Sequence, residues 1–460
     1  MSSVSAVFGP TLEEMRNPKL LPHHIADQAQ KARHDDPLNE INLYNITWHL
    51  EDGTIPHLVL PRQLTGTRAH VVVMSGRHFP TGSHKVGPAY SIVREHQMAG
   101  HIAPGQGRLV FPSTGNFGIG GAWVGPRMHY ESLIVLPEEM SAERFEKIHG
   151  YGADIIATHG CESNVKEIYD KVNELRLDPT NKILNQFEEF ANYRFHYHVT
   201  GHAILDLLAS LQARGIGNGQ PAAFISAMGS AGTIAAGDLL KQHHSACAIV
   251  GLEPIQCPTL YNVGYGGHRI EGIGDKHVTW LHHVTNMDLM MCIDDRDTLR
   301  GMQLLQDGAE HLAQGLDVDE LDALGMNGVF GPSGVCNVLG AIKTAHFLNL
   351  TEQDVVVTVA TDGYDRYPSV SARLDAEEGP MTREEAWRRF EIFLNARPDY
   401  VLEGTREVRR RWHNQKYFTW VEQQGKSIAE LDRLLDEDFW VEQQVCIPAL
   451  DGQWKELRGW

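Results

Sequence analysis

The sequence predicts an α/β fold in which parallel β-sheets carry helices on both faces, with an extra helical segment at the C-terminal end. Short runs rich in valine, isoleucine and leucine recur along the chain. Each run enters a loop rich in glycine, serine or threonine, and a segment with helical spacing follows. Strands that alternate with helices in this way form parallel sheets. The length of 460 residues favours two lobes or two to three domains.

The first predicted strand, 69–74 (AHVVVM), runs into a turn-rich loop that ends at Lys85. A helix is expected after this loop, through about Gln97. The segment 108–123 (RLVFPSTGNFGIGGAW) repeats the order of strand, polar loop and helix. Two further strands, with a helix between them, are predicted at 131–137 and 153–160.

The alternation resumes at 222–240, 246–254 and 354–363, where each apolar run ends in a loop. In open α/β sheets, ligands bind at this carboxyl edge of the strands. The last ninety or so residues are instead rich in charge and tryptophan, and Ser427 with Glu430 forms a capping-box pattern. We expect this tail to be a helical appendage that packs on the core or on a partner subunit.

Composition excludes several classes of protein. A formal net charge of −19 disfavours nucleic-acid binding, which needs clustered Lys and Arg. The six cysteines are widely spaced without a CxxC pair, which indicates a reducing compartment and a cytoplasmic location. No apolar run approaches the ~20 residues that span a bilayer, so no membrane association is expected. The basic stretch 406–416 is interpreted as a solvated helix face or a subunit contact.

Three loops carry chemistry. The loop 79–85 (FPTGSHK) places Lys85 after small hydroxyl-bearing residues, and a partly desolvated lysine can form a Schiff base with an aldehyde. In 112–118 (PSTGNFG), hydroxyls and backbone N–H groups at a helix start can bind a carboxylate or cap the helix. The run 229–233 (GSAGT) offers several amides and two hydroxyls to a phosphate, and it lacks the lysine and spacing of a nucleoside-triphosphate P-loop.

In this order, the three loops resemble those of the fold-type II pyridoxal phosphate (PLP) enzymes, specifically the cysteine synthase and cystathionine β-synthase family of the tryptophan synthase β-like superfamily. The family segments read approximately NPTGSxKDR, TSGNTG and GTGGT. The resemblance runs from about His70 to Ser369 and includes five further segments: NQFEEFANYRFHYHVTGHAI (185–204), GLEP (251–254), GGHRIEGIG (266–274), GPSGVCNVLGAI (331–342) and ATDGYDRYPS (360–369).

The resemblance implies a two-lobed PLP-binding catalytic core at 66–370, with a small lobe at about 80–190 and a large lobe formed by the rest. Residues 1–65 would be an N-terminal extension packed on the large lobe, and 371–460 a helical C-terminal extension. A homodimer is expected, as in the family. The partner of the site would be a small-molecule amino acid.

Position by position, the resemblance assigns PLP to Lys85. The ring 3′-oxygen would contact Asn116, and either Thr361 or Asp362 would face the pyridine nitrogen. The cradle for the phosphate would comprise Gly229, Ser230, Ala231, Gly232 and Thr233. The residues that would bind the substrate are Ser113, Thr114, Gly115, Phe117 and Gln186.

The implied function is β-elimination or β-replacement on a serine- or cysteine-like amino acid, through a Lys85 aldimine and an aminoacrylate. Two departures from the family affect the substrate: Val86-Gly87 replaces Asp-Arg, and Phe117 replaces a threonine. The first alternative is a PLP-dependent deaminase, dehydratase or threonine synthase-like enzyme. The second is a PLP-binding or regulatory homologue without turnover.

Three histidines could also indicate a metal site. His198 and His202 are four residues apart, a spacing at which two histidines on one helix can bind zinc, and His196 is nearby. The same segment already matches the PLP family, and the chain is rich in histidine throughout, so no metal site is expected. The pair His282 and His283 is expected at the surface or at an interface.

Overall fold

The computed structural model describes residues 5–113, 115–308, 311 and 325–460, and it contains two separate β-sheets. The larger sheet has seven strands in the order β1-β2-β10-β7-β8-β9-β11. Its inner strands are parallel, and the two edge strands β1 and β11 are antiparallel to their neighbours. Their bounds are β1 His57–Val59, β2 His70–Ser75, β7 Pro221–Ala227, β8 Ala248–Pro254, β9 Leu289–Ile293, β10 Val355–Ala360 and β11 Val401–Glu403.

The smaller sheet has four parallel strands in the order β5-β4-β3-β6 and comes from one continuous part of the chain. Its strands are β3 Arg108–Pro112, β4 Glu131–Pro137, β5 Asp154–Thr158 and β6 Asn181–Ile183. Four helices accompany this sheet: α4 Val86–Met98, α5 Asn116–Arg127, α6 Ala142–Gly150 and α7 Val165–Leu175. The predicted alternation of strand, loop and helix is therefore confirmed, as is the parallel α/β class.

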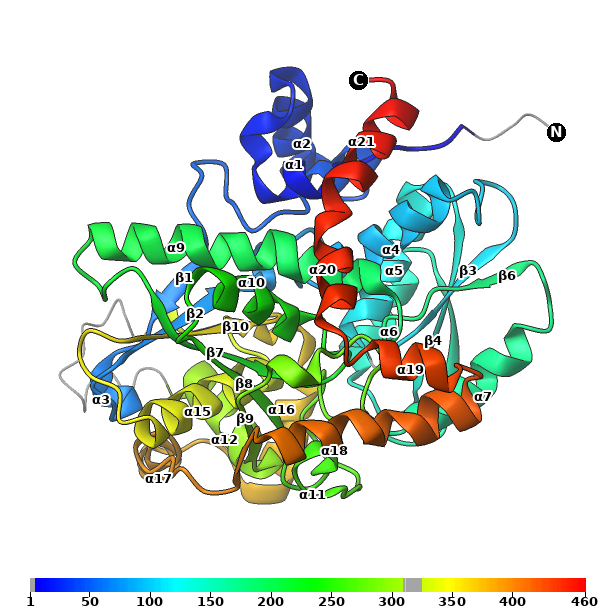
Figure 1. Cartoon of the computed structure of the whole chain (residues 1–460). Coiled ribbons are helices and arrows are strands. Elements are labelled where there is room, and N and C mark those ends of the chain that lie inside the picture. Colours follow the sequence, from blue (N-terminus) through cyan, green and yellow to red (C-terminus); the bar gives the residue numbers. More distant parts are fainter. Residues whose placement is uncertain (1–4, 114, 309–310, 312–324) are drawn as a thin grey trace.

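Helices cover both faces of the large sheet because successive strand side chains point to opposite sides. Val357 of β10 packs in one core cluster with residues of α9 and α10, whereas its neighbour Val356 packs in a second cluster with residues of α12, α15 and α17. Figure 1 shows α9 on one side of this sheet and α15 with α12 on the other. The helices in and around these two layers are α8 Phe190–Phe195, α9 Gly201–Ala213, α10 Ala236–His243, α11 Thr259–Asn262, α12 Asp295–Asp307, α15 Pro332–Phe347, α16 Pro368–Glu378 and α17 Arg383–Leu394.

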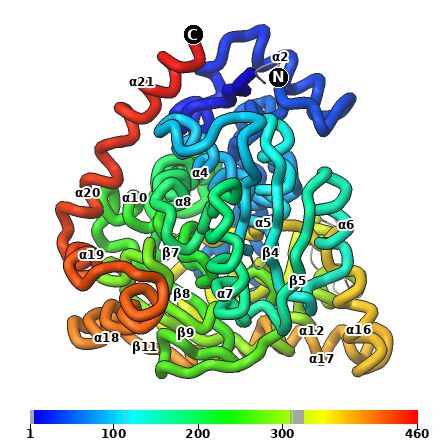
Figure 2. The backbone as a smooth tube through the Cα atoms, turned by 90° about the vertical axis from the view of Figure 1, so that its right-hand side faces the viewer, coloured from blue at the N-terminus to red at the C-terminus, as the bar shows by residue number. Residues whose placement is uncertain are grey.

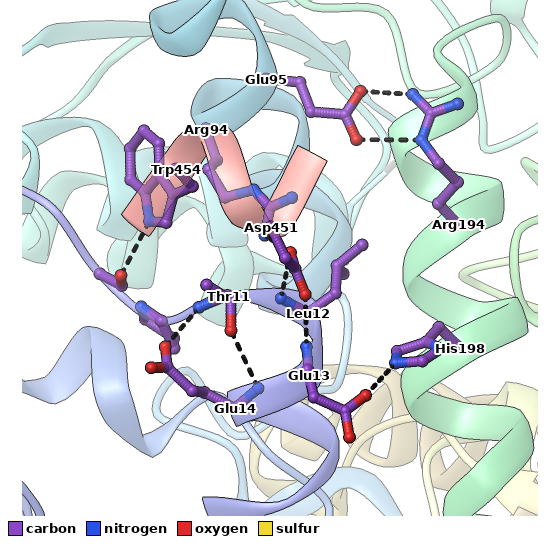
Figure 3. A network of polar contacts seen from close by, with 12 residues as sticks. Thr11, Leu12, Glu13, Glu14, Arg94, Glu95, Arg194, His198, Asp451 and Trp454 are labelled. Atoms are coloured by element: carbon purple, nitrogen blue, oxygen red, sulfur yellow. Dashed lines mark hydrogen bonds and ion pairs between the residues drawn. The ribbon is translucent and has the colours of Figure 1, made fainter. Parts of the chain in front are cut away.

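The two ends of the chain meet. The tail helices run along one side of the molecule and reach the N-terminal helices, as both views show (Figures 1 and 2). Trp454 donates a hydrogen bond to Gly9 O, and Arg458 pairs with Glu14 at 2.7 Å (Figure 3 shows the neighbouring contacts). The elements are α1 Leu12–Arg16, α2 His23–Asp35 and α3 Arg62–Thr65 at the start, and α18 Arg406–Tyr417, α19 Ile428–Arg433, α20 Glu437–Val445 and α21 Ile447–Arg458 in the tail.

The tail is mostly helical and the predicted capping box of Ser427 and Glu430 is present, but three details differ from expectation. The tail adds edge strand β11 to the large sheet. The basic stretch 406–416 is not simply a solvated face, because Lys416 is fully buried and donates to two backbone carbonyl oxygens. His282 and His283 are buried, since Trp440 of the tail stacks on His283 with ring centroids 4.2 Å apart.

Within the described residues, no helix is long and apolar enough to cross a membrane. The same part of the chain holds no group of three His, Cys, Asp or Glu side chains arranged to bind a metal ion. His198 instead pairs with Glu13 at 2.7 Å, and His196 contacts the Thr200 hydroxyl at 3.0 Å. All six cysteines are free thiols.

Candidate active site

Lys85 ends the loop that leaves β2, and helix α4 begins at the next residue. Its amine donates a hydrogen bond to Ser230 Oγ at 2.9 Å, so the lysine loop and the glycine loop meet. Burial lowers the pKa of the Lys85 amine to about 8, and the negative charges of Asp275 and Glu162 oppose this shift. A lysine with this pKa is in part a neutral amine at pH 7 to 8, which is the form that attacks an aldehyde.

The lysine loop is held by a buried arginine. Gly82 has a φ of +74°, and a Cβ atom there would lie 2.8 Å from Arg366 Nη2, so glycine is required on two grounds. The same Nη2 donates to the carbonyl oxygen of Thr81. Ser83 forms an isolated bridge with Asp362, which ties this loop to the end of β10. The backbone of the loop that carries Lys85 is thus held both by Arg366 and by the end of β10.

The glycine loop, 229–233, leads from β7 into a 3-10 turn that begins at Thr233 and continues as helix α10. Ser230 Oγ accepts from Lys85 and from Asn192 Nδ2, the latter at 3.1 Å. A Cβ on Gly232 would lie 2.1 Å from Asn192 Oδ1, so no larger residue fits there. Amides and hydroxyls at the start of a helix are the donors that bind a phosphate dianion.

A cavity joins these loops to the carboxyl ends of β7 and β10 and to the start of α15. Thr361 follows β10 and lies in the wall. Ser333, in the first turn of α15, is buried, and its hydroxyl has no hydrogen-bond partner within the described residues. The lining residues are Lys85, Ser226, Ala227, Gly229, Ser230, Ala231, Gly232, Thr233, Gly272, Ile273, Ser333, Asn337 and Thr361.

Asp362, the neighbour of Thr361, is fully buried in a polar network outside this wall. Its Oδ2 accepts from Asn116 Nδ2 at 2.6 Å and from the Tyr367 hydroxyl at 2.7 Å. Arg366 donates to Asn116 Oδ1 at 3.0 Å, so both ends of the Asn116 amide are engaged. Of the two residues expected at the ring nitrogen, the structure therefore brings Thr361, and not Asp362, into the cavity with Lys85.

The segment that includes Asn116 connects β3 of the four-stranded sheet to α5, and Thr114 lies outside the described residues. The buried Ser113 hydroxyl accepts from the backbone N–H groups of Gly115 and Gly118 at 2.9 and 2.7 Å, so it shapes the turn into α5. Gly115 has a φ of +148°, and a Cβ there would lie 2.4 Å from a buried arginine, Arg144. Phe117 packs against Phe111 with ring centroids 5.8 Å apart. The structure therefore places Phe117 in the hydrophobic core with Phe111 instead of the cavity wall.

Gln186 is buried, and Asn192 links it to the glycine loop. The backbone carbonyl oxygen of Gln186 accepts from Asn192 Nδ2 at 2.9 Å, and the same side-chain amide donates to Ser230 Oγ. Of the predicted site residues, Lys85, Thr361 and all five of the glycine loop share one cavity. Ser113, Gly115, Asn116, Phe117 and Gln186 are absent from its lining among the described residues.

The cavity suits PLP on the chemistry of its donors. It combines a lysine amine, an anion-binding loop at a helix start and a buried hydroxyl with an unused hydrogen-bonding capacity. The model of the pyridoxal-phosphate dependent enzyme family matches residues 53–362. The chain belongs to this family. Its cofactor is therefore PLP, and the protein is a PLP-dependent enzyme.

Known members of the PLP family differ in how much of this chain they match. A cysteine synthase of Staphylococcus aureus is 31% identical over 223 residues, which are 48% of this chain and 69% of that relative. Cysteine synthase B of Pseudomonas aeruginosa is 28% identical over 324 residues, or 69% of this chain and 94% of the relative. The crystal structure of a hydrogen sulfide-producing enzyme from Fusobacterium nucleatum is similar in fold, with a TM-score of 0.57, 24% identity, and coverage of 76% and 95% of the two chains.

Sequence reasoning did not single out three residues that lie in or beside this cavity. Ser333 was visible as a serine at the predicted start of a helix, in the segment 331–342 that resembles the family. His84 precedes the lysine and its Nε2 contacts Thr233 Oγ1 at 3.3 Å, but a histidine in a loop is not distinctive alone. Asp275 is buried and lines a second cavity that shares Gly229 and Ala231 with the first, so its position becomes apparent only when the loops are assembled in space.

Proposed function

We propose that this PLP enzyme catalyses β-elimination or β-replacement on a serine- or cysteine-like amino acid, with Lys85 as the lysine that holds PLP. The observation that carries the assignment is the 2.9 Å hydrogen bond between Lys85 Nζ and Ser230 Oγ, since it brings an amine of lowered pKa to an anion-binding loop. The cysteine synthases of two bacteria, at 31% and 28% identity, support β-chemistry.

In this proposal the residues of the chain divide the work. The glycine loop and the helix start behind it would bind the phosphate, and the hydroxyls of Ser333 and Thr361, which line the same cavity, would be available to the ring. When bound, PLP withdraws the electrons that remain on the substrate Cα after it loses its proton. Lys85 carries the one ionisable side chain among the described lining residues of the cavity, and its amine would accept that proton. Loss of the β-substituent follows.

The test is product analysis with a panel of serine, O-acetylserine, cysteine and threonine, each with and without a thiol as second substrate. We expect sulfide release from cysteine, or a new β-thioether from at least one of serine, O-acetylserine and cysteine. Reaction of threonine alone, with a keto acid as the product, would replace the proposal by a dehydratase. A protein that binds PLP but turns over none of these would indicate a non-catalytic homologue.

The proposed contact between Ser333 and the ring yields a prediction. If the Ser333 hydroxyl bonds the ring, Ser333→Ala removes a hydrogen bond worth about 1 kcal/mol, so the Kd for PLP is expected to rise roughly five- to tenfold. The measurement is a titration of apo-protein with PLP, followed by absorbance. Asp362→Asn is the matched comparison, because Asp362 is engaged with Asn116 and Tyr367, and we expect it to change thermal stability more than PLP affinity. A larger loss of affinity in Asp362→Asn would place the aspartate at the ring instead.

We also propose a homodimer in the cytoplasm. Six free thiols support a reducing compartment, and the family resemblance supports the dimer. Light scattering on the eluting protein measures the dimer directly: a mass near twice 51.4 kDa supports it, and a single-chain mass contradicts it.

A further inference from the structure

His84 is a buried imidazole that directly precedes Lys85 and that the mechanism above leaves unused. Its side chain is inaccessible to water, and Nδ1 has no hydrogen-bond partner within the described residues. The backbone N–H of His84 donates to Thr361 O at 3.4 Å, which fixes the residue against the end of β10. An apolar residue could fill this space without leaving a buried nitrogen unpaired, so stability alone does not account for the histidine.

The other ring nitrogen of His84 contacts the wall of the Lys85 cavity. Nε2 lies 3.3 Å from Thr233 Oγ1, and Thr233 lines that cavity together with Lys85. Thr233 is the last residue of the glycine loop and begins the 3-10 turn that continues as α10. Its hydroxyl therefore lies where a helix start offers hydrogen-bond donors to an anion. The side chain of His84 thus bonds a residue of the proposed phosphate cradle.

The surroundings of His84 indicate which ring nitrogen carries the hydrogen. Burial, together with the nearby Lys85 charge, lowers the pKa of His84 well below its usual range, so the ring is neutral and has one N–H. A hydrogen on Nδ1 would have no acceptor within the described residues, whereas a hydrogen on Nε2 faces Thr233 Oγ1. Buried N–H groups without an acceptor are rarer than buried acceptors without a donor, which favours the Nε2–H form. Thr233 Oγ1 then accepts from His84 and keeps its own hydrogen for a ligand.

Aromatic rings from two other segments enclose His84. His196 meets it edge to face, with ring centroids 5.1 Å apart and the ring planes at 85°. The ring centroid of Trp48 lies 5.5 Å from that of His84 and 5.0 Å from that of Phe79, which begins the lysine loop. The Trp48 indole N–H and His196 Nδ1 both contact Thr200 Oγ1, each at 3.0 Å. Because Trp48 precedes β1, the N-terminal part of the chain supports the lysine loop on a side that does not line the cavity.

We propose that His84 is a positioning residue for the cofactor phosphate: it donates to Thr233 Oγ1, turns the hydroxyl hydrogen of Thr233 into the cavity, and is itself held in place by Trp48. The inference rests on the proposed function in one respect, the assignment of the glycine loop to the phosphate. Without the imidazole, the Thr233 hydroxyl is free to rotate, which weakens its hydrogen bond to a charged phosphate. PLP should therefore bind more weakly, whereas pyridoxal, which has the same aldehyde and ring but no phosphate, should not.

The test compares PLP with pyridoxal in titrations of apo-protein, followed by absorbance. His84→Asn places an amide near the position of Nδ1, out of reach of Thr233, so its Kd for PLP should rise about five- to tenfold. His84→Gln extends an amide to the position of Nε2 and should keep the Kd for PLP within about twofold of wild type. The Kd for pyridoxal should change by less than about twofold in both variants. A PLP affinity that is unchanged or higher in His84→Asn, or equal losses for PLP and pyridoxal, would overturn the proposal.

Thr233→Val separates the role of His84 from the assignment of the phosphate. Removing the hydroxyl should raise the Kd for PLP about 10- to 100-fold, and adding His84→Asn to this variant should cause no further loss. If Thr233→Val left the PLP affinity unchanged, the glycine loop would not hold the phosphate, and the proposed function would lose its anion site. If Thr233→Val lost affinity and His84→Asn added a second, independent loss, only the positioning role of His84 would be overturned.

Trp48→Phe is a further variant, and it leaves His84 itself unchanged. Phenylalanine keeps an aromatic ring at this place but removes the hydrogen bond to Thr200, so the Kd for PLP should rise about two- to fivefold with that for pyridoxal unchanged. Trp454→Phe is the matched control, because Trp454 is equally buried and donates to Gly9 O where the chain ends meet. It should leave both Kd values unchanged. A ratio of the two affinities that is the same in Trp48→Phe as in wild type would contradict the support by Trp48.

Discussion

Lys85→Ala is expected to abolish turnover, with a loss of at least about 10³-fold in kcat. The substitution removes the amine that we propose holds PLP and accepts the Cα proton. Because the amine also donates to Ser230, the glycine loop loses one contact as well, but the rest of the cavity wall remains. The measurement is the initial rate with the best substrate of the panel, together with the absorption band of lysine-bound PLP, which should vanish.

Lys416→Met is the matched control for this variant. Lys416 is also buried, burial also lowers its pKa, here to about 7, and it donates to Trp280 O and His282 O at 2.9 and 2.7 Å. Removing Lys416 should lower stability but leave the PLP band in place. If Lys85→Ala kept the band while Lys416→Met lost it, the cofactor would be assigned to the wrong lysine.

Asp451→Ala is expected to destabilise the protein by about 3–5 kcal/mol, the cost of breaking a buried ion pair by removing one partner. Asp451 Oδ1 accepts from Arg94 Nη1 at 2.8 Å, with both side chains nearly inaccessible to water. Its two oxygens also accept from the N–H groups of Leu12 and Glu13, so the tail caps helix α1 (Figure 3). Arg94 lies on α4, the helix that begins directly after Lys85, and the tail is thereby connected to the site.

Urea denaturation with two probes, fluorescence of the buried tryptophans and far-UV dichroism, measures the loss. Glu352→Ala is the comparison. Glu352 pairs with Arg68 at 2.7 Å, but both side chains are exposed, so the pair should contribute little to the free energy of unfolding. If Asp451→Ala were as mild as Glu352→Ala, the tail would not be an integral part of the fold.

The parts of the fold that sequence reasoning predicted are those determined locally. The strand expected at 131–137 has the observed bounds of β4, since a continuous apolar run of this length reads as a buried strand. The helix expected after Lys85 extends to Met98, one residue past the predicted end. The meeting of the lysine loop and the glycine loop was implied by the resemblance to the fold-type II family and not by local pattern, and Lys85 and Ser230 are in contact.

The parts that it missed depend on contacts between distant positions. Trp412, Trp420, Trp440 and Trp454 are all buried, but their spacing in the tail does not tell which surface they cover. The burial of His283 results from Trp440, which lies far away in the sequence. Edge strand β11 has three residues, too few for a periodic pattern to appear. The separation of Thr361 from Asp362 likewise depends on Asn116 and Tyr367, which hold the aspartate away from the cavity wall.

The most direct test of the account is to locate the PLP-bearing lysine chemically. Wild-type protein saturated with PLP is reduced with sodium borohydride, which fixes the cofactor to the lysine that holds it, then digested and mapped by mass spectrometry. We predict a pyridoxyl group on Lys85, at close to one per chain. A pyridoxyl group on a different lysine, or none in a protein that fails to develop the PLP band, would contradict the central claim.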